Sequence, residues 1–274
     1  MAEKYVRPAI YAGNFYSLNS SELEHQLNDF FSQTKGIEKE CRIIVSPHAG
    51  YVYSGRTAAY AVSSLKPAKS YIILGPNHTG LGETFAIMPS GGVWDTPLGR
   101  VETNKKLAEK LLSSCGLLKE DHEAHMREHS IEVQLPFLQF LNKEFTFVPI
   151  SIMSECTKEF AARCEELGKT IAKIMKEEDL SLIISSDFSH YLSEKEAEEK
   201  DNKAIERIED LDLYGFFETL QETDASICGY GPIGVAIVVA KELGLHAEII
   251  HRSNSGQVTK DFNKIVSYIA IGFE

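Results

Sequence analysis

The chain has 274 residues, 43% of them hydrophobic and 25% charged, which is enough to bury a sizeable core as one large or two small domains. Its formal net charge of −12 disfavours nucleic acid and anionic lipid as partners, because neither is held without a strong basic patch. The sequence lacks an apolar membrane span, a signal peptide and any C-x-x-C pair among its five scattered cysteines, so we expect a cytoplasmic protein with reduced thiols and no structural zinc ribbon.

Helical and extended segments alternate along the chain. Ser21 and Glu24 have the spacing of a capping box at the start of a first helix, with a stripe at Leu23, Leu27 and Phe30 behind it. The segment 85–103 is interrupted by prolines and glycines, which favours a hairpin and loop. We predict strands over 41–46, 71–74, 145–150, 182–186, 247–251 and 265–273, and further helices over 54–65, 104–113, 129–141, 157–177, 195–210, 212–220 and 232–243. This alternation predicts one α/β domain over residues 1–274 with a mostly parallel sheet.

Three of the predicted strands lead directly into turns that carry histidine. His48 follows the first strand, His78 follows the second, and Asp187 and His190 follow the strand that ends near residue 186. In an open α/β sheet, ligands bind outside the carboxyl ends of the strands. If these strands are parallel neighbours, the four side chains converge on one crevice.

Those residue types are suited to a metal site with an acid–base pair. His48 and His78 could supply two imidazole ligands, and Cys228, just before a predicted helix, is the best candidate for a third. The N-terminal end of that helix would favour thiolate over thiol. Asp187 and His190 could act as an acid–base pair, or Asp187 could itself bind the metal.

Each feature also has a purely structural interpretation. A single histidine in a turn is usually a surface or hydrogen-bonded residue, and a single cysteine before a helix is usually a small buried hydrophobe. A competing cluster consists of His122, His125 and His129, which would share one face if that stretch is helical, although a solvated connection is the simpler interpretation. His129 opens an apolar segment and could also point into the crevice. Signatures of nucleotide-binding loops, zincin proteases and α/β-hydrolases are missing.

Five ordered motifs resemble the Memo (mediator of ErbB2-driven cell motility) family. They are Pro-His-Ala-Gly-Tyr at 47–51, Gly-Pro-Asn-His at 75–78, Glu-His-Ser-Ile-Glu at 128–132, Ser-Ser-Asp-Phe-Ser-His at 185–190 and Cys-Gly-x-x-Pro-Ile-Gly at 228–234. The segments Arg-Pro-Ala at 7–9 and Gly-Asn-Phe-Tyr at 13–16 also fit the start of that family. The resemblance covers essentially the whole chain. It implies a mixed, mostly parallel sheet flanked by helices on both faces, similar in fold to the LigB-like class III extradiol dioxygenases, which are non-haem iron enzymes.

The resemblance also implies roles for individual positions. His48, His78 and Cys228 match the metal site of Memo-like proteins, for which iron or copper is usually discussed, and Asp187 and His190 match positions that line the same pocket. Ring-cleaving extradiol enzymes instead use two histidines and a carboxylate on Fe(II), so catechol cleavage does not transfer to a site with a sulfur ligand. The phosphotyrosine-peptide adaptor role of animal members does not transfer either, because the sequence shows no arginine cluster suited to phosphate.

The sequence therefore favours a metal-dependent redox or oxygenase-like protein acting on an unidentified small molecule. We expect one transition metal ion, with iron(II) preferred and copper or zinc as alternatives. His190 would move protons, Asp187 would orient it, and His129, Tyr51 and Asn77 would complete the pocket. Two other interpretations stay open: a non-catalytic module that binds a peptide or protein in the same pocket, and metal-free nucleophilic catalysis by Cys228 with His190. The sequence does not indicate an oligomeric state.

Overall fold

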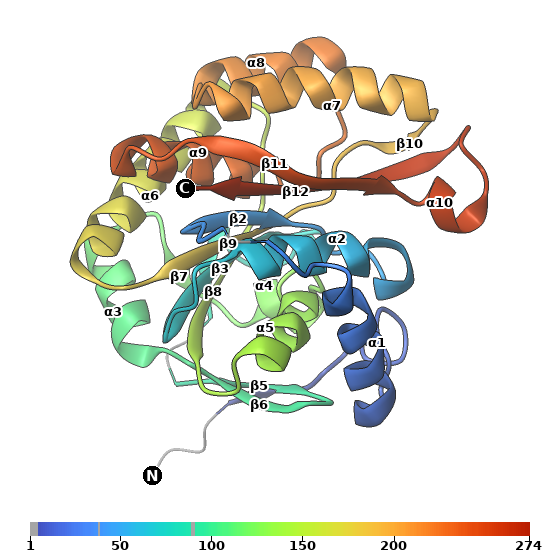
Figure 1. The fold of residues 1–274 in the computed structure, drawn as a ribbon. Coiled ribbons are helices and arrows are strands. Elements are labelled where there is room, and N and C mark those ends of the chain that lie inside the picture. The colour runs from blue at the N-terminus through green and yellow to red at the C-terminus, as the bar shows by residue number, and fades with distance from the viewer. Residues whose placement is uncertain (1–4, 38, 89–90) are drawn as a thin grey trace.

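The structure is a computed structural model that describes residues 5–37, 39–88 and 91–274. Within these ranges it confirms the predicted α/β fold, in which a mixed, mostly parallel sheet is covered by helices on both faces (Figure 1). The strands described are β1 Val6–Arg7, β2 Ile43–Ser46, β3 Ser70–Pro76, β4 Phe85–Ile87, β5 Val93–Thr96, β6 Gly99–Thr103, β7 Lys119–Glu120, β8 Thr146–Ile152, β9 Ser181–Ser185, β10 His190–Leu192, β11 Ala247–Asn254 and β12 Ile265–Phe273.

The centre of the sheet consists of β8, β3, β9 and β2 in that order, and each neighbouring pair is parallel. On one side, β12 pairs antiparallel with β2 and also with β11 and β10. On the other side, β6 joins β8, and β5 and β1 follow it toward the edge. The short strands β4 and β7 branch from β8. Because they are parallel, β2, β3 and β9 have their carboxyl ends at one edge of the sheet.

Helices lie on both faces of this sheet. The described helices are α1 Ser20–Ser32, α2 Tyr51–Ser64, α3 Lys105–Ser114, α4 Glu123–Met126, α5 Leu135–Leu141, α6 Lys158–Glu177, α7 Glu194–Glu209, α8 Leu213–Thr223, α9 Tyr230–Leu243 and α10 Gly256–Thr259, with a 3-10 turn η1 at Glu132–Gln134. Helices α1, α2 and α5 pack on one face, and α3, α6 and α9 pack on the other (Figure 1). Helix α8 packs on α6 and α9, and α7 packs on α8 and on β10, β11 and β12.

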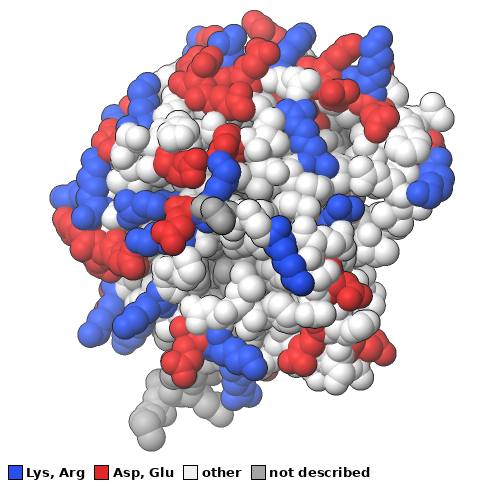
Figure 2. Space-filling model, viewed as in Figure 1, with Lys and Arg blue, Asp and Glu red and all other residues white. Residues whose placement is uncertain are grey.

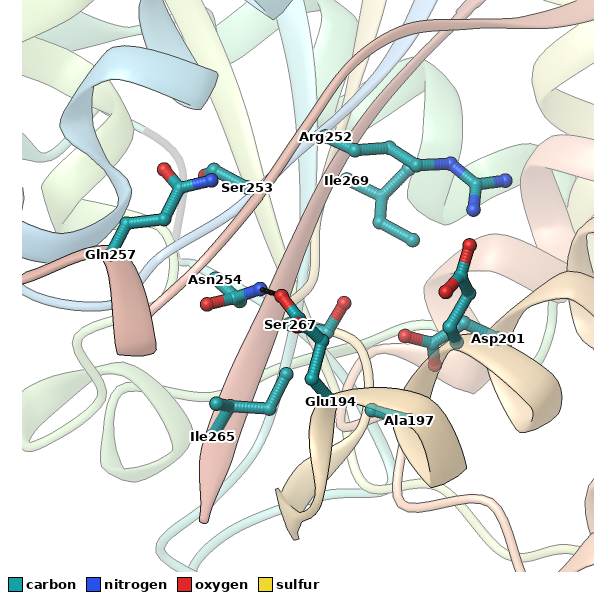
Figure 3. A pocket seen from close by; sticks show the side chains of 11 residues that line it. Glu194, Ala197, Asp201, Arg252, Ser253, Asn254, Gln257, Ile265, Ser267 and Ile269 are labelled. Carbon is teal, nitrogen blue, oxygen red and sulfur yellow. Dashed lines mark hydrogen bonds between the residues drawn. The ribbon is translucent and has the colours of Figure 1, made fainter. Parts of the chain in front are cut away.

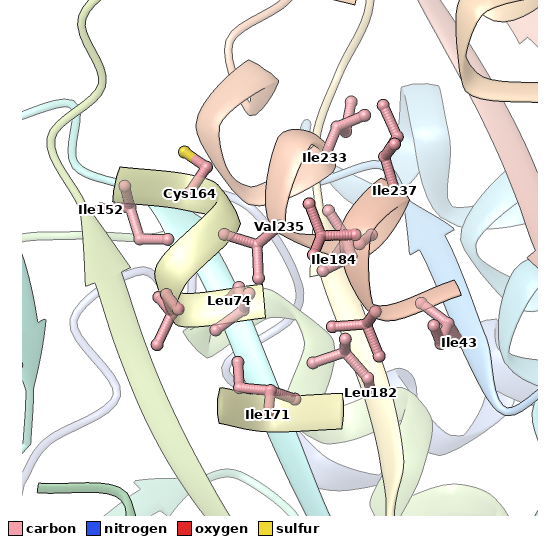
Figure 4. Close-up of a cluster of buried hydrophobic side chains, with 14 of the residues drawn as sticks. Ile43, Leu74, Ile152, Cys164, Ile171, Leu182, Ile184, Ile233, Val235 and Ile237 are labelled. Atoms are coloured by element: carbon pink, nitrogen blue, oxygen red, sulfur yellow. The ribbon is translucent and has the colours of Figure 1, made fainter. Parts of the chain in front are cut away.

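Successive side chains of each central strand point to opposite faces of the sheet, so the interior has two hydrophobic cores. In β2, Ile43 and Val45 belong to the core under α6 and α9, whereas Ile44 belongs to the core under α1 and α2. Figure 4 shows the first core, where Ile171 of α6 and Val235 of α9 lie over the strands. A strand that is covered on both faces buries every one of its side chains, so its sequence is an unbroken run of apolar residues.

Two local predictions are wrong. The first helix begins earlier, and its cap is Asn19, whose side chain accepts a hydrogen bond from the Glu22 amide, so Ser21 does not form the predicted capping box. The predicted helix over 129–141 is regular only from Glu132 onward, as a 3-10 turn followed by α5, because His129 belongs to the turn before it. Among the described residues, no helix has the length and apolar character needed to cross a bilayer.

Candidate metal centre

The ends of β2, β3 and β9 bring three predicted site segments together. His48 follows β2, His78 follows β3 and Asp187 follows β9, and these strands are adjacent and parallel in the order β3, β9, β2. One nitrogen from each of His48, His78 and His129 lies within 4.8 Å of the others, close enough for one metal ion. The predicted convergence of His48 and His78 is therefore confirmed, and His129 joins them.

His48 is held with one ring nitrogen toward the site. Its Nδ1 lies 2.9 Å from the Ser185 hydroxyl oxygen. That hydroxyl donates its own proton to the Ser130 carbonyl at 2.6 Å, so it can only accept from His48. The Nδ1 atom must therefore carry the ring proton, which leaves the lone pair of Nε2 free for a cation.

Glu128 fixes His78 in the same way. The Nδ1 atom of His78 lies 2.9 Å from one carboxylate oxygen of Glu128, and the backbone amide of His78 donates to the other at 2.6 Å. Ser130 adds an amide hydrogen bond of 2.9 Å to the same side chain. Burial opposes ionisation of Glu128, but the hydrogen bond and charge of His78 prevail and lower its pKa to about 2. A permanent carboxylate thus orients His78 with Nε2 facing the site.

His129 completes the histidine cluster from the turn before η1. Its ring stacks on His78 with centroids 4.7 Å apart, and it meets His48 edge-on at 5.2 Å. Phe15 packs against it as well, with ring centroids 4.7 Å apart. Burial, reinforced by His48, lowers the pKa of His129 to about 3, and burial lowers the pKa of His48 as well. Both rings are neutral near pH 7, which is the form that binds metal.

The sulfur of Cys228 lies beside this cluster, just before α9. It lies 3.1 Å from Nε2 of His48 and accepts a hydrogen bond of 3.2 Å from the backbone amide of Asp187. A glycine follows because a Cβ atom at position 229 would lie 2.5 Å from the Cβ of Ser186. Burial and the Asp187 carboxylate raise the pKa of the thiol, so the prediction that the helix end makes thiolate the favoured form is wrong for the protein without a cation. A bound cation would have to displace this proton.

Asp187 and His190 flank the cluster but use different partners. The Asp187 carboxylate accepts a hydrogen bond of 2.8 Å from the backbone amide of His48. Burial nevertheless raises the pKa of this carboxyl. The Nδ1 atom of His190 lies 2.8 Å from the Ser226 carbonyl, and the Ser226 hydroxyl accepts the backbone amide of His190. Ser226 therefore orients His190 and leaves its Nε2 atom available, while Asp187 positions the His48 turn. No sequence motif points to Ser226.

The two other predicted pocket residues use their polar groups to hold the surrounding chain. The buried Tyr51 hydroxyl donates to the Val133 carbonyl at 2.7 Å. Asn77 accepts from the backbone amide and hydroxyl of Thr79, and its side-chain amide donates to Leu81. These bonds fix the start of α2 and the turn that carries His78.

The competing cluster of His122, His125 and His129 does not share one helical face. Helix α4 ends at Met126, so His129 lies outside it. His125 is buried and its Nε2 atom lies 3.2 Å from the Ala86 carbonyl, whereas the His122 ring packs on Tyr5. Helical spacing would place the three together only if α4 continued through residue 129, which it does not.

A buried ion pair that the sequence did not reveal supports the turn of Glu128 and His129. Arg7 donates to Glu132 at 2.6 Å, and both side chains are fully buried. Arg7 also donates to the carbonyls of His125 and Glu128, and its guanidinium lies 4.1 Å from the Trp94 ring centroid. The arginine thereby ties the N-terminal strand to the segment that carries two site residues.

Comparison with known proteins identifies relatives of this chain. The family model described as "Memo-like protein" matches residues 7–272. A MEMO1 family protein of Thermoplasma volcanium is 39% identical, with 97% of both chains covered, and one of Methanosarcina barkeri is 41% identical, with 97% of this chain and 98% of its own covered. A crystal structure of an uncharacterized Escherichia coli K12 protein shares the fold with a TM-score of 0.59 at 13% identity, covering 84% of this chain and 98% of its own. The chain belongs to the Memo-like family.

Proposed function

We propose that this protein is a metal-dependent redox enzyme, similar to oxygenases, that acts on a small molecule at the histidine cluster. The observation that carries the proposal is the meeting of His48, His78 and His129 within 4.8 Å at the carboxyl ends of the central strands. The hydrogen bonds of His48 and His78 support it, because each ring uses Nδ1 for a contact within the protein and keeps Nε2 for another partner. Such outer partners commonly orient the ligands of metal sites.

His48 and His78 would be two ligands, and we propose Cys228 as the third. Its sulfur lies next to the free nitrogen of His48, and sulfur favours iron, copper or zinc over magnesium or calcium. His129 is the alternative third ligand: its nitrogen, unlike the sulfur of Cys228, belongs to the group of ligand atoms that all lie within 4.8 Å of one another, although its Nδ1 atom also lies 3.4 Å from Glu128. One transition metal ion, preferably iron(II), would supply Lewis acidity and redox chemistry when bound.

His190 would transfer protons to or from the substrate through Nε2, because its other nitrogen is fixed by Ser226. Asp187 would hold the His48 turn and contribute negative charge to the pocket. Metal-free nucleophilic catalysis by Cys228 with His190 is disfavoured by the raised pKa of Cys228, since the nucleophile of such a pair is the thiolate. We also propose a cytoplasmic location, which the five unpaired cysteines support.

The decisive experiment is anaerobic purification followed by metal quantification. The wild type should contain about one transition metal ion per chain, and the double variant His48→Ala/Cys228→Ala should contain none. Cys156→Ala is the matched cysteine control: Cys156 is half-buried and its sulfur lies near the Phe217 carbonyl, so this variant should keep the metal. Unchanged metal content in the double variant would reject the site.

Single variants decide the third ligand. Cys228→Ser should abolish the sulfur-to-metal charge-transfer absorption of the cobalt-loaded protein, whereas His129→Gln should preserve it. If the absorption is missing from the wild type, Cys228 is not a ligand. Catalysis is tested by oxygen uptake of the iron-loaded protein with candidate small molecules, in which His190→Ala should slow turnover and leave metal content unchanged.

A further inference from the structure

Tyr191, the residue that follows His190, has a left-handed backbone conformation with a φ of 60°. Bulky L-residues rarely adopt this conformation, because the Cβ atom crowds the backbone. The Tyr191 side chain is 67% exposed, so burial of the ring does not offset the strain. The ring meets His190 edge-on with centroids 5.9 Å apart, and Nζ of Lys264 lies 5.2 Å from its centroid. Backbone strain of this kind is concentrated at functional sites, which directs attention to the neighbouring histidine.

The strained residue is the extra residue of a β-bulge between β10 and β12. His190 lies opposite Val266 and Leu192 lies opposite Ile265, so two steps along β10 match one step along β12. The bulge type that contains a left-handed residue normally has glycine there, because glycine lacks the Cβ atom that crowds the backbone. Bulges bend a strand and redirect its side chains, and they are common next to active sites.

The chain that leads into the bulge is held by four successive backbone amides, each bound to a different segment. The donors are Asp187, Phe188, Ser189 and His190, and the acceptors are the Cys228 sulfur, the Ser267 carbonyl, the Asp201 carboxylate and the Ser226 hydroxyl, at distances of 3.2, 2.9, 3.1 and 2.8 Å. The His190 ring is bound as well, with Nδ1 at 2.8 Å from the Ser226 carbonyl. The backbone up to His190 therefore has a fixed position.

The chain that leaves the bulge is held at the start of α7. Ser193 and Glu196 form a capping box there. The Glu194 amide donates to the Phe262 carbonyl at 2.9 Å, and the Glu194 carboxylate accepts the Asn254 side-chain amide at 2.9 Å (Figure 3). Many charged side chains cover the outer surface over α7 and α8 (Figure 2), so these contacts, rather than packing on the outside, fix where α7 begins.

Because both ends are fixed, the extra residue determines which face of β10 carries the His190 ring. Without the bulge, and with Leu192 still opposite Ile265, Tyr191 would take the place of His190 in the pairing. His190 would then move one residue farther along β12. A shift of one residue turns a strand side chain to the opposite face of the sheet, so the ring would lose the Ser226 carbonyl.

We propose that Tyr191 is a positioning residue, whose left-handed backbone directs the His190 ring toward the candidate metal centre. This inference rests on the proton-transfer role proposed for His190, but the geometry exists without metal or substrate. The Nδ1 atom of His190 faces a carbonyl and must carry the ring proton, which leaves Nε2 unprotonated. The bulge keeps this bond and thereby keeps Nε2 available to the pocket.

Nitrogen NMR of the metal-free protein with nitrogen-15 in its histidine rings tests the proposal. At about pH 8.5, where an ordinary imidazole is neutral, the wild type should show an unprotonated Nε2 for His190, assigned by its loss in His190→Gln. Tyr191→Gly, Tyr191→Ala and Tyr191→Val all lack the ring, and they tolerate a positive φ in decreasing order. The glycine variant should keep this signal, the alanine variant should weaken it, and the valine variant should lose it.

Lys260→Val is the matched control. Lys260 is exposed, has a φ of 63° and closes α10, so valine there strains the backbone outside β10. This variant should lower the urea midpoint about as much as Tyr191→Val does, and it should leave the His190 signal unchanged. Loss of the signal in Lys260→Val would mean that general destabilisation, rather than the bulge, moves His190.

Two other results would overturn the proposal. A wild-type signal in Tyr191→Val would show that the bulge does not direct His190, and loss of the signal in Tyr191→Gly would assign the effect to the ring. If Tyr191→Val does not fold, equal signals in the glycine and alanine variants would contradict the proposal. Because the sample contains no metal, these results do not depend on whether the proposed metal centre binds its ion.

Discussion

Glu128 determines the direction of His78 and lies next to His129, although it does not itself enter the cluster. Its two oxygens together accept the His78 ring, the His78 amide and the Ser130 amide. A glutamine at this position has one oxygen acceptor, so at least one of these donors would lose its partner. The carboxylate is thus a positioning residue for the metal site.

We predict that Glu128→Gln weakens metal binding by about 10- to 100-fold, as is typical for the loss of a partner that orients a ligand. Competition with a chromophoric chelator measures this affinity. Glu123→Gln, which makes the same change at an exposed position five residues earlier, is the control and should bind as the wild type does. Equal affinities of the Glu128 and Glu123 variants would show that Glu128 has no role in ligand orientation.

His125 gives a pH dependence that is independent of metal. It is buried, and burial together with Arg7 lowers its pKa to about 3. In the unfolded chain its pKa is about 6.5, so below that pH the unfolded chain takes up a proton that the folded protein excludes. The contribution of His125 to the free energy of unfolding is therefore largest above about pH 6.5, and it decreases as the pH drops toward about 3.

We therefore expect His125→Gln to flatten the acid side of the stability profile. Between about pH 6 and about pH 4, the wild type should lose up to about 1.4 kcal/mol per pH unit more than the variant. Urea unfolding at a series of pH values measures the difference. His25→Gln, at an exposed position, should leave the wild-type slope unchanged. Parallel profiles for wild type and His125→Gln would contradict the buried neutral state.

At the scale of elements, β1 depends on the ion pair between Arg7 and Glu132. Removing one partner leaves the other charge buried without compensation, so Arg7→Ala should reduce the free energy of unfolding by about 3–5 kcal/mol. Chemical denaturation provides the measurement. Arg100→Ala, which breaks an exposed pair with Asp95, should cost at most about 1 kcal/mol. Similar losses of free energy of unfolding in Arg7→Ala and Arg100→Ala would mean that burial does not determine the cost of breaking these ion pairs.

The elements that were predictable are those whose signal is local. The strand 265–273 and the helix 157–177 follow from apolar periodicity and turn residues, and the structure matches them within a residue. The sequence predicts helix over 129–131, but tertiary contacts of Glu128 and Ser130, which no local pattern reports, hold this segment in a turn. The cap at Asn19 was missed because Ser21 offers a competing local motif.

The candidate site likewise has a part that the sequence predicts and a part that only the folded chain reveals. Placement of His48, His78 and Asp187 followed from strand order, because the rule for strand ends needs only the strands and their direction. The partners that set ring orientation, Ser185 and Ser226, depend on atoms brought from distant segments. Residue types in a turn do not specify those contacts, so their roles become apparent only in the folded chain.

At the scale of the whole molecule, four parallel strands covered on both faces create one edge where distant loops meet. The proposed function requires this edge to hold a transition metal on His48 and His78. Anomalous diffraction from crystals of the anaerobically purified protein, recorded at the absorption edge of the bound metal, tests this requirement most directly. We predict one strong peak at bonding distance from a ring nitrogen of each residue; a fully loaded protein whose peak lies elsewhere would contradict it.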